Sequence, residues 1–221
     1  MQDIKMIRNV ALFGHGKSGK TSLAEALLFT AGKTNRLGKV DDGSSIMDYE
    51  PEEIQRKLSI SNSFNNLTWK KHQIFLTDTP GDDNFINEAK FAARVADNAV
   101  FTIGAVLGVK YQTEKIAAFI KSTSLPTLIF LNKMDRERAD FERVIGEIKA
   151  RLPQDPAIIY LPIGAESDFK GAVDVIKGCA WFLTPDGKAK EGAVPDDMKD
   201  DVELALAQLM EQVAETDDEL V

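Results

Sequence analysis

Apolar runs and amphipathic segments alternate along the first two thirds of the chain. Four runs dense in aliphatic and aromatic residues predict strands buried on both faces, at residues 9–14, 73–78, 99–105 and 127–132. Helical spacing of apolar positions predicts helices between and after them, at residues 20–31, 85–94, 112–122 and 141–152. Strands that alternate with helices are typical of an α/β fold, a mostly parallel sheet with helices on both faces.

The pattern changes after residue 152. Prolines separate short strand-like pieces such as residues 158–163. One amphipathic helix follows, because apolar residues repeat at helical spacing with acidic residues opposite them, at Val202, Leu206, Leu209, Met210 and Val213. We therefore expect two domains, residues 1–152 and a smaller α+β domain at residues 153–221. Within the first, the polar segment 32–58 is too long for a simple connection and is expected to be a functional or mobile loop.

Composition narrows the class of protein. The chain has 221 residues and a single cysteine, Cys179, in an apolar run, where we expect it to pack rather than react. No apolar run approaches the roughly 20 residues that cross a bilayer, and the first residues lack the apolar centre of a secretory signal. These features predict a cytoplasmic protein with no internal disulfide and no membrane partner.

The charge is concentrated at one end. Residues 195–221 carry a net charge of −9, whereas the whole chain carries −8, so the rest is nearly neutral. A nearly neutral bulk argues against DNA as a partner. The acidic end is either a solvated face or a docking face.

The segment GHGKSGKT, residues 14–21, follows a predicted strand and opens a predicted helix, as the phosphate-binding motif G-x-x-x-x-G-K-[ST] requires. Its backbone N–H groups and the helix N-terminus suit phosphates. Lys20 is expected to neutralise charge on the β- and γ-phosphates during hydrolysis, and the Thr21 hydroxyl to ligate Mg²⁺. The predicted nucleotide-binding residues here are Gly14, His15, Gly16, Lys17, Ser18, Gly19, Lys20, Thr21 and Ser22.

Two later segments complete the predicted nucleotide site. Asp78 ends the strand before DTPG, where the second carboxylate on the Mg²⁺ side belongs in such folds, and Gly81 offers a backbone N–H to the γ-phosphate. NKMD, residues 132–135, follows another strand. The Asp135 carboxylate can accept two hydrogen bonds from guanine, the Lys133 stem can cover the base, and Asn132 precedes them. Adenine has no matching pair of donors, so an ATPase or kinase is disfavoured.

These residues, in this order, resemble the N-terminal G domain of elongation factor G, a family of ribosomal GTPases. The likeness runs from about residue 7 to residue 221 and includes GVKYQTEK, NKMDRERADF, LPIGAE and AETDDEL, which go beyond generic GTPase motifs. It implies a P-loop GTPase fold, GTP or GDP with Mg²⁺ as cofactors, and the ribosome as partner for a monomeric protein. It also implies that DYEPEEIQRKLSI, residues 48–60, is the first switch.

The resemblance places residues 153–221 in a truncated part of the insert domain that this family carries within its G domain. The last guanine-contacting loop would then lie beyond residue 221. An alternative remains: IIYLPIGAE, residues 158–166, can be the sixth strand of the parallel sheet followed by a guanine-contacting loop at Gly164 and Ala165. In the family the insert meets the stalk protein of the ribosome, which makes the acidic helix a candidate docking face.

Three positions depart from the family pattern. In the first switch, Ser59 keeps the hydroxyl that ligates Mg²⁺, but Lys57 replaces a glycine and puts the usual backbone path in doubt. Lys17 replaces a P-loop aspartate implicated in holding a monovalent cation. It is either an exposed loop lysine or a substitute for that cation.

The third departure is Asp82, which stands where the family has the histidine that positions the attacking water. We take Asp82 and Lys20 as the candidate catalytic residues. Loss of a water-positioning group costs about 10²–10⁴ in rate. The expected function is therefore a GTP-binding domain of a ribosome-associated translation factor with weakened or altered hydrolysis. The alternatives are a GTP-dependent binding module without efficient turnover, or a GTPase of the ribosome-protection or release-factor type.

Overall fold

The computed structural model describes residues 3–153, 155–184 and 188–216. The chain forms two compact units, each described by itself. The first takes in residues 1–133 and 143–154, and the second takes in residues 134–142 and 155–221. The domain boundary expected at residue 153 stays a prediction.

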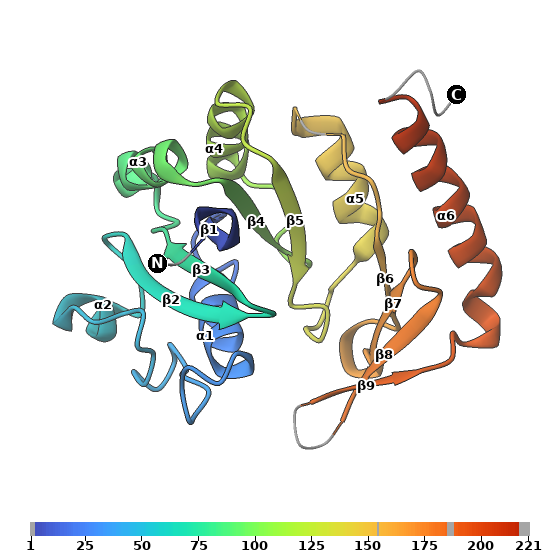
Figure 1. Cartoon of the computed structure of the whole chain (residues 1–221), viewed down its shortest axis with the longest axis horizontal. Coiled ribbons are helices and arrows are strands. Elements are labelled where there is room, and N and C mark those ends of the chain that lie inside the picture. Colours follow the sequence, from blue (N-terminus) through green and yellow to red (C-terminus); the bar gives the residue numbers. More distant parts are fainter. Residues whose placement is uncertain (1–2, 154, 185–187, 217–221) are drawn as a thin grey trace. The chain divides into compact units, whose positions relative to one another are not determined.

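The first unit is built on a five-stranded sheet in the order β2-β3-β1-β4-β5 (Figure 1). Strands β1, β3, β4 and β5 run parallel, and β2 pairs antiparallel with β3 at the edge. The strands are β1 (Ile7–Phe13), β2 (Ser63–Trp69), β3 (His72–Asp78), β4 (Asn98–Gly104) and β5 (Thr127–Asn132). Each strand expected from an apolar run is present within two residues of its predicted start.

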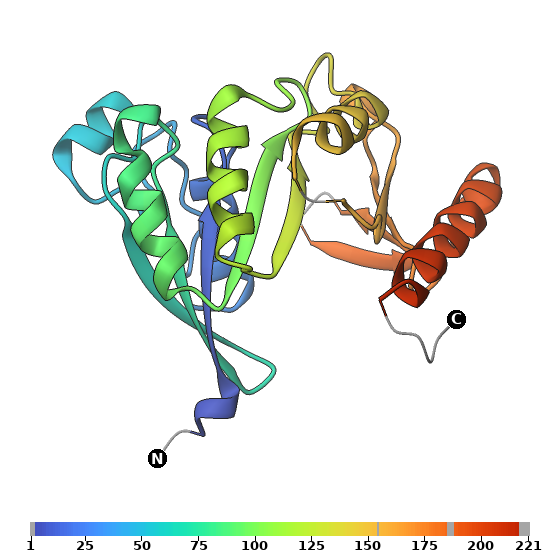
Figure 2. The ribbon, with the colours of Figure 1, turned by 90° about the horizontal axis from the view of Figure 1, so that it is seen from above.

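Helices cover both faces of this sheet, as Figure 2 shows from above. These helices are α1 (Lys20–Thr30), α3 (Ile86–Val95), α4 (Tyr111–Ser122) and α5 (Phe141–Arg151), and a shorter helix, α2 (Pro51–Arg56), lies in the segment that precedes β2. Ala11 and Phe13 of β1 pack with α3, α4 and α5, whereas Leu12 between them packs with α1. Successive strand residues point to opposite faces, so continuous apolar runs are what a doubly covered sheet needs. The predicted fold class is confirmed.

In the first unit, the pattern missed one strand, β2, and one α-helix, α2. Strand β2 contains Asn65 and Asn66, and as an edge strand it can carry polar residues that a central strand could not bury. It returns to β3 through Lys70 and Lys71, which take positive φ angles of 44° and 71°. Helix α2 has six residues, too few to display helical periodicity.

The second unit contains a four-stranded antiparallel sheet, β6-β7-β8-β9. Its core joins Ile163, Val173, Ala180 and Val202. Since β6 pairs with β7 from Tyr160↔Asp174 to Ile163↔Gly171, the alternative of a sixth parallel strand is wrong. The strands are β6 (Tyr160–Ile163), β7 (Gly171–Asp174), β8 (Cys179–Leu183) and β9 (Ala189–Gly192).

The acidic amphipathic helix is present as α6 (Lys199–Ala214), preceded by the 3-10 turn η4 (Asp196–Met198). Residues 217–221, including the end of AETDDEL, lie outside the described residues. Val202 is buried, but Met210 is 65% exposed and Val213 is 48% exposed. Within the described part of the chain, the apolar face of α6 is therefore buried near its start, half-buried at Leu206 and Leu209, and exposed towards its end. No helix among the described residues is long and apolar enough to cross a membrane.

Candidate nucleotide site

The phosphate-binding loop lies where the sequence places it, between the end of β1 and the start of α1. Gly14 (φ 142°) passes so close to β4 that an added Cβ would lie 2.2 Å from the Thr102 carbonyl oxygen. Gly19 (φ 98°) is the N-cap of α1, and its added Cβ would lie 2.1 Å from the Asn132 side-chain nitrogen. Gly14 is therefore required by the close approach of backbone as well as by its own conformation, whereas Gly19 is required chiefly by its positive φ, because the Asn132 side chain could shift.

Lys20 is the buried cation of this loop. Its side chain is only 5% exposed, and its Nζ donates to the His15 carbonyl oxygen at 3.1 Å. Burial lowers the pKa of Lys20 to about 8, against the opposing effect of Asp78 and Asp48. A buried ammonium with so little compensation favours an anionic ligand.

Several buried polar atoms around the loop have no hydrogen-bond partner among the described residues. They are His15 Nε2, Ser18 Oγ, Asp78 Oδ1 and Thr102 Oγ1. Burial lowers the pKa of His15, as do the nearby charges of Lys20, Lys110 and Lys133, although the Gly16 hydrogen bond opposes them. Buried polar groups are normally satisfied, so this cluster fits a site that a polar ligand completes.

A chain of oxygen atoms marks the metal side of the site. Thr21 Oγ1 donates to Asp78 Oδ2 at 2.6 Å and lies 3.3 Å from Ser59 Oγ. Ser59 Oγ in turn donates to Asp48 Oδ1 at 2.8 Å. Burial raises the pKa of Asp78 to about 6 and also raises the pKa of Asp48.

This oxygen set fits Mg²⁺, which prefers carboxylate and hydroxyl ligands together with substrate phosphates. Thr21, Ser59 and Asp78 would hold the ion, and Asp48 adds a carboxylate that sequence analysis missed. Asp48 is the first residue of the expected first switch, which is the signal that could have found it. The described ranges contain no group of three or more His, Cys, Asp or Glu side chains that could hold a metal, so the fit rests on the hydroxyl oxygens as well as on the carboxylates.

Two buried glutamates anchor the first switch around these ligands. Glu25 of α1 accepts from Ile46 N at 2.6 Å, and Glu53 of α2 accepts from Ile60 N at 2.8 Å. Glu25 is 0% exposed and Glu53 is 1% exposed. The two carboxylates therefore fix the backbone on both sides of Asp48 and Ser59. Sequence analysis missed both residues, because nothing in the polar pattern distinguishes them from surface acids.

The doubt about Lys57 has a structural answer. Lys57 ends α2 at φ 52° and ψ 45°, in the left-handed region that favours glycine. The lysine thus adopts the backbone path that a glycine would take.

Residues 79–85, which follow β3 and which we call the second switch, lie against the phosphate loop. An added Cβ at Gly81 would lie 2.4 Å from Lys20 Nζ and 2.6 Å from Gly16 N, so only glycine fits. Asp82 caps the 3-10 turn η2 (Asp83–Phe85), and its Oδ1 accepts from Asn84 N at 2.9 Å and Asn84 Nδ2 at 2.8 Å. Lys17 (φ 64°) is exposed, and the described residues show no ion pair between Lys17 and Asp82.

The strand-end motif of β5 is tied to the phosphate loop. Asn132 Nδ2 donates to the Ser18 carbonyl oxygen at 3.0 Å, and Lys133 Nζ donates to the Lys17 carbonyl oxygen at 2.7 Å. Ser22 lies exposed in the first turn of α1. The structure thus brings the predicted residues of the first unit together around one loop.

Asp135 belongs to the second unit. Its carboxylate is 63% exposed and lies 3.6 Å from Arg136 Nε. In the same unit, Glu166 N donates to the Met134 carbonyl oxygen at 2.7 Å, and Glu166 Oε1 accepts from Arg138 N at 2.6 Å. The loop after β6 therefore holds the turn that carries Asp135, a contact that sequence analysis did not predict.

Comparison with known proteins gives consistent matches. The family described as "Elongation factor Tu GTP binding domain" matches residues 5–217. Elongation factor G of Mycoplasma pneumoniae is 37% identical over 221 residues, and that of Fervidobacterium nodosum is 36% identical over 222 residues. Each alignment covers 99% of this chain and 32% of the relative, so the chain spans about a third of these relatives' length.

A solved structure agrees. A crystal structure of a protein from Thermus thermophilus superposes with a TM-score of 0.91 at 31% sequence identity. The match covers 97% of this chain and 32% of that protein.

Proposed function

The chain belongs to the family of elongation factor Tu GTP-binding domains, and from that premise we propose that it binds GTP and GDP with Mg²⁺ and hydrolyses GTP poorly. The predicted resemblance to elongation factor G is confirmed, and the chain is a translational GTPase domain of that kind. What it does as part of a longer protein belongs to the proposal. We propose the ribosome as its partner because the relatives are named elongation factor G.

One observation carries nucleotide binding. Buried Lys20 and the partnerless buried atoms of His15, Ser18 and Asp78 surround a glycine-rich loop that no larger residues could form. Backbone N–H groups of residues 14–21 and the Lys20 ammonium would bind the phosphates. When bound, Mg²⁺ would neutralise phosphate charge from the oxygen side formed by Thr21, Ser59 and Asp78.

Weak hydrolysis rests on Asp82. A carboxylate about 6 Å from one unit of γ-phosphate charge adds repulsion of roughly 3 kcal/mol at an effective dielectric of 20. The Asp82 Oδ1 atom accepts both hydrogen bonds from Asn84, so one carboxylate oxygen is already engaged within the turn η2 and is not free to orient a water molecule. The second candidate function is a binding module without efficient turnover, and it also rests on Asp82 standing where a water-positioning group is expected.

The test uses the full-length protein with GTP, GDP and ATP, each with Mg²⁺ and with a chelator. We expect GTP and GDP to bind, ATP to compete poorly, and Lys20→Ala to lower GTP affinity by at least about 100-fold. Lys121→Ala, which removes an exposed lysine of α4, should change nothing. Unchanged affinity in Lys20→Ala would remove the phosphate-loop assignment.

Phosphate release over many turnovers, with and without ribosomes, separates the two candidates. Slow turnover that ribosomes stimulate identifies a GTPase. Binding without ribosome-stimulated turnover identifies the binding module.

A further inference from the structure

One ion pair joins the second switch to a neighbouring helix. Lys115 Nζ of α4 lies 3.0 Å from Asp83 Oδ1 and 2.9 Å from Asp83 Oδ2, so it engages both carboxylate oxygens. The two residues are 32 positions apart in the chain. The Lys115 side chain is 36% exposed and the Asp83 side chain 41% exposed, so the pair is partly shielded from water.

The lysine is held from a second side. Its Nζ lies 4.6 Å from the centroid of the Tyr111 ring, one turn earlier on α4. A cation over an aromatic face adds attraction and restricts the lysine rotamer. The ammonium is therefore positioned for Asp83 by its own helix.

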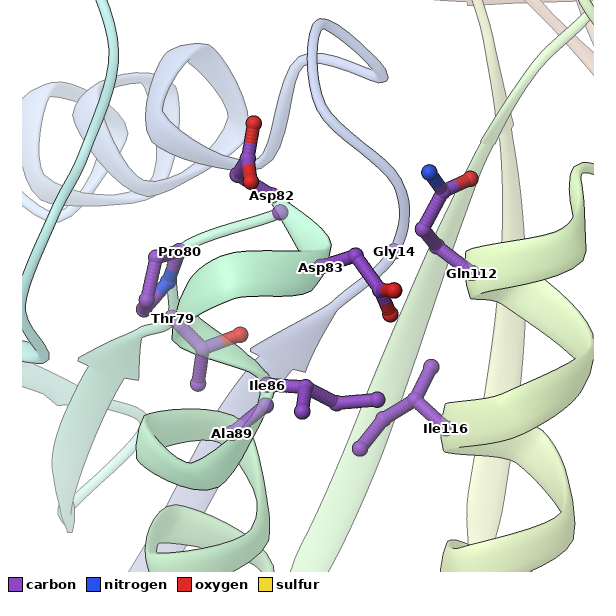
Figure 3. Close-up of a pocket in the computed structure, with 10 residues that line it drawn as sticks. Gly14, Thr79, Pro80, Asp82, Asp83, Ile86, Ala89, Gln112 and Ile116 are labelled. Carbon is purple, nitrogen blue, oxygen red and sulfur yellow. The ribbon is translucent and has the colours of Figure 1, made fainter.

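A gap in the packing lies beside this ion pair. A small pocket lies between this segment and α4, with Asp83 of η2 and Ile86 of α3 on one wall and Gln112 and Ile116 of α4 on the other (Figure 3). Figure 3 shows Asp83 pointing toward α4, whereas Asp82 points to the other side. Side chains that line a pocket lack packing contacts on that side. The ion pair therefore contributes a larger share of the interaction between η2 and α4.

We propose that the Asp83–Lys115 pair is a tether that holds the second switch against α4 and sets how readily Gly81 and Asp82 move relative to the phosphate loop. The tether stands on its own contacts, but its effect on nucleotide rests on the proposed GTP binding. Asp82 directly precedes Asp83 and caps η2, so a displacement of η2 carries Asp82 with it. Gly81 then leaves its place against Lys20 and Gly16.

The first test is hydrogen exchange of residues 83–95 in the full-length protein without nucleotide. Asp83→Asn, which removes only the ion pair, should speed exchange there by about 2- to 5-fold. Lys115→Met also removes the ring contact and should speed it by about 3- to 10-fold. In 0.5 M salt the difference from wild type should shrink. Lys121→Met is the matched control: it removes a charge of α4 for which the described residues show no acidic partner.

A charge exchange completes the test. Asp83→Lys combined with Lys115→Asp keeps the summed side-chain length and should recover at least half of the lost protection. If hydrogen exchange in the single variants is no faster than in Lys121→Met, the tether is overturned. So would an exchanged pair no better protected than the single variants.

A separate measurement addresses the link to nucleotide. The ratio of GTP to GDP affinity should change by about 2- to 5-fold in the single variants and return in the exchanged pair, since a ligand that contacts the second switch responds to its freedom. An unchanged ratio in variants with faster exchange overturns the link. If wild type binds neither nucleotide, the proposed function fails, while the exchange result still decides the tether.

Discussion

Charged side chains in this site differ in how their charge is compensated. Lys20 is buried with its ammonium on a backbone carbonyl oxygen, and Asp78 is buried with one unpartnered oxygen. Asp82, by contrast, has its charge spread over two hydrogen bonds from Asn84. Lys20 and Asp78 therefore gain most from a bound nucleotide and metal, whereas Asp82 already has hydrogen-bond partners within its own turn.

At residue scale, we expect Lys17 and Asp82 to interact once GTP is bound. The Lys17 ammonium can then offset the repulsion between Asp82 and the γ-phosphate and stand in for a monovalent cation. Lys17→Ala alone should weaken GTP binding more than Lys17→Ala with Asp82→Ala, because the single change leaves a carboxylate beside the phosphates. At about 4 Å and an effective dielectric of 20 the pair interacts by roughly 4 kcal/mol before desolvation, so the net coupling is smaller.

Titration calorimetry of the two single variants and the double variant measures this coupling. GTP affinity and hydrolysis should also be insensitive to added potassium. Strictly additive affinities would contradict the interaction, as would a GTP-bound structure that keeps the two side chains well beyond salt-bridge distance without a bridging water.

At the scale of elements, the central parallel sheet could be predicted because burial on both faces leaves a continuous apolar signal. Strand β5 has the predicted bounds, 127–132. Strand β2 could not be predicted, since an edge strand with Asn65 and Asn66 looks like a polar loop. Helix α2 is too short for periodicity and depends on the tertiary contacts of Glu53.

The same limit applies to the site. The phosphate-loop residues could be predicted because their glycines and lysine occupy fixed spacings. Glu25 and Glu53 could not be predicted, because they anchor the first switch only by being buried. Their side chains are 0% and 1% exposed, and sequence spacing does not reveal burial. Asp48 lay inside a segment already expected to act as a switch, but only the Ser59 hydrogen bond at 2.8 Å identifies it.

At this scale we predict that Glu53 controls access to the first switch. Glu53→Ala leaves the Ile60 and Ser61 N–H groups without their acceptor, at a cost of about 1–3 kcal/mol. Trypsin should then cleave after Arg56 or Lys57 on the order of 10-fold faster in the nucleotide-free protein. Glu52→Ala is the matched control, because Glu52 is exposed on the same helix. Equal cleavage rates in the two variants would show that Glu53 does not anchor the loop.

At the scale of the whole molecule, the negative charge lies at the end of the second unit. The acids of η4 and the first turn of α6 include Asp196, Asp197, Asp200 and Asp201, with Lys199 bonded to Asp196 at 2.6 Å. Acids at a helix N-terminus are favourable to the helix itself. Stabilisation of α6 is therefore one reason for these acidic residues, and the proposed docking to a partner is the other.

The last prediction separates these two reasons. Reversing Asp197, Asp200, Asp201 and Glu203 to lysine should slow association of the full-length protein with ribosomes in low salt, if α6 faces a basic stalk surface. The same reversal places cations at a helix N-terminus, at about 0.3–1 kcal/mol for each residue in the first turn, so helix content by circular dichroism must be measured alongside. Changing the same four residues to Asn and Gln, without reversing charge, should give a smaller slowing. At 0.5 M salt the three proteins should associate alike, because screening removes steering but not a folding defect. If the charge-reversed protein associates with ribosomes at an unchanged rate in low salt, the acidic residues form a solvated face whose function is to stabilise the start of their own helix.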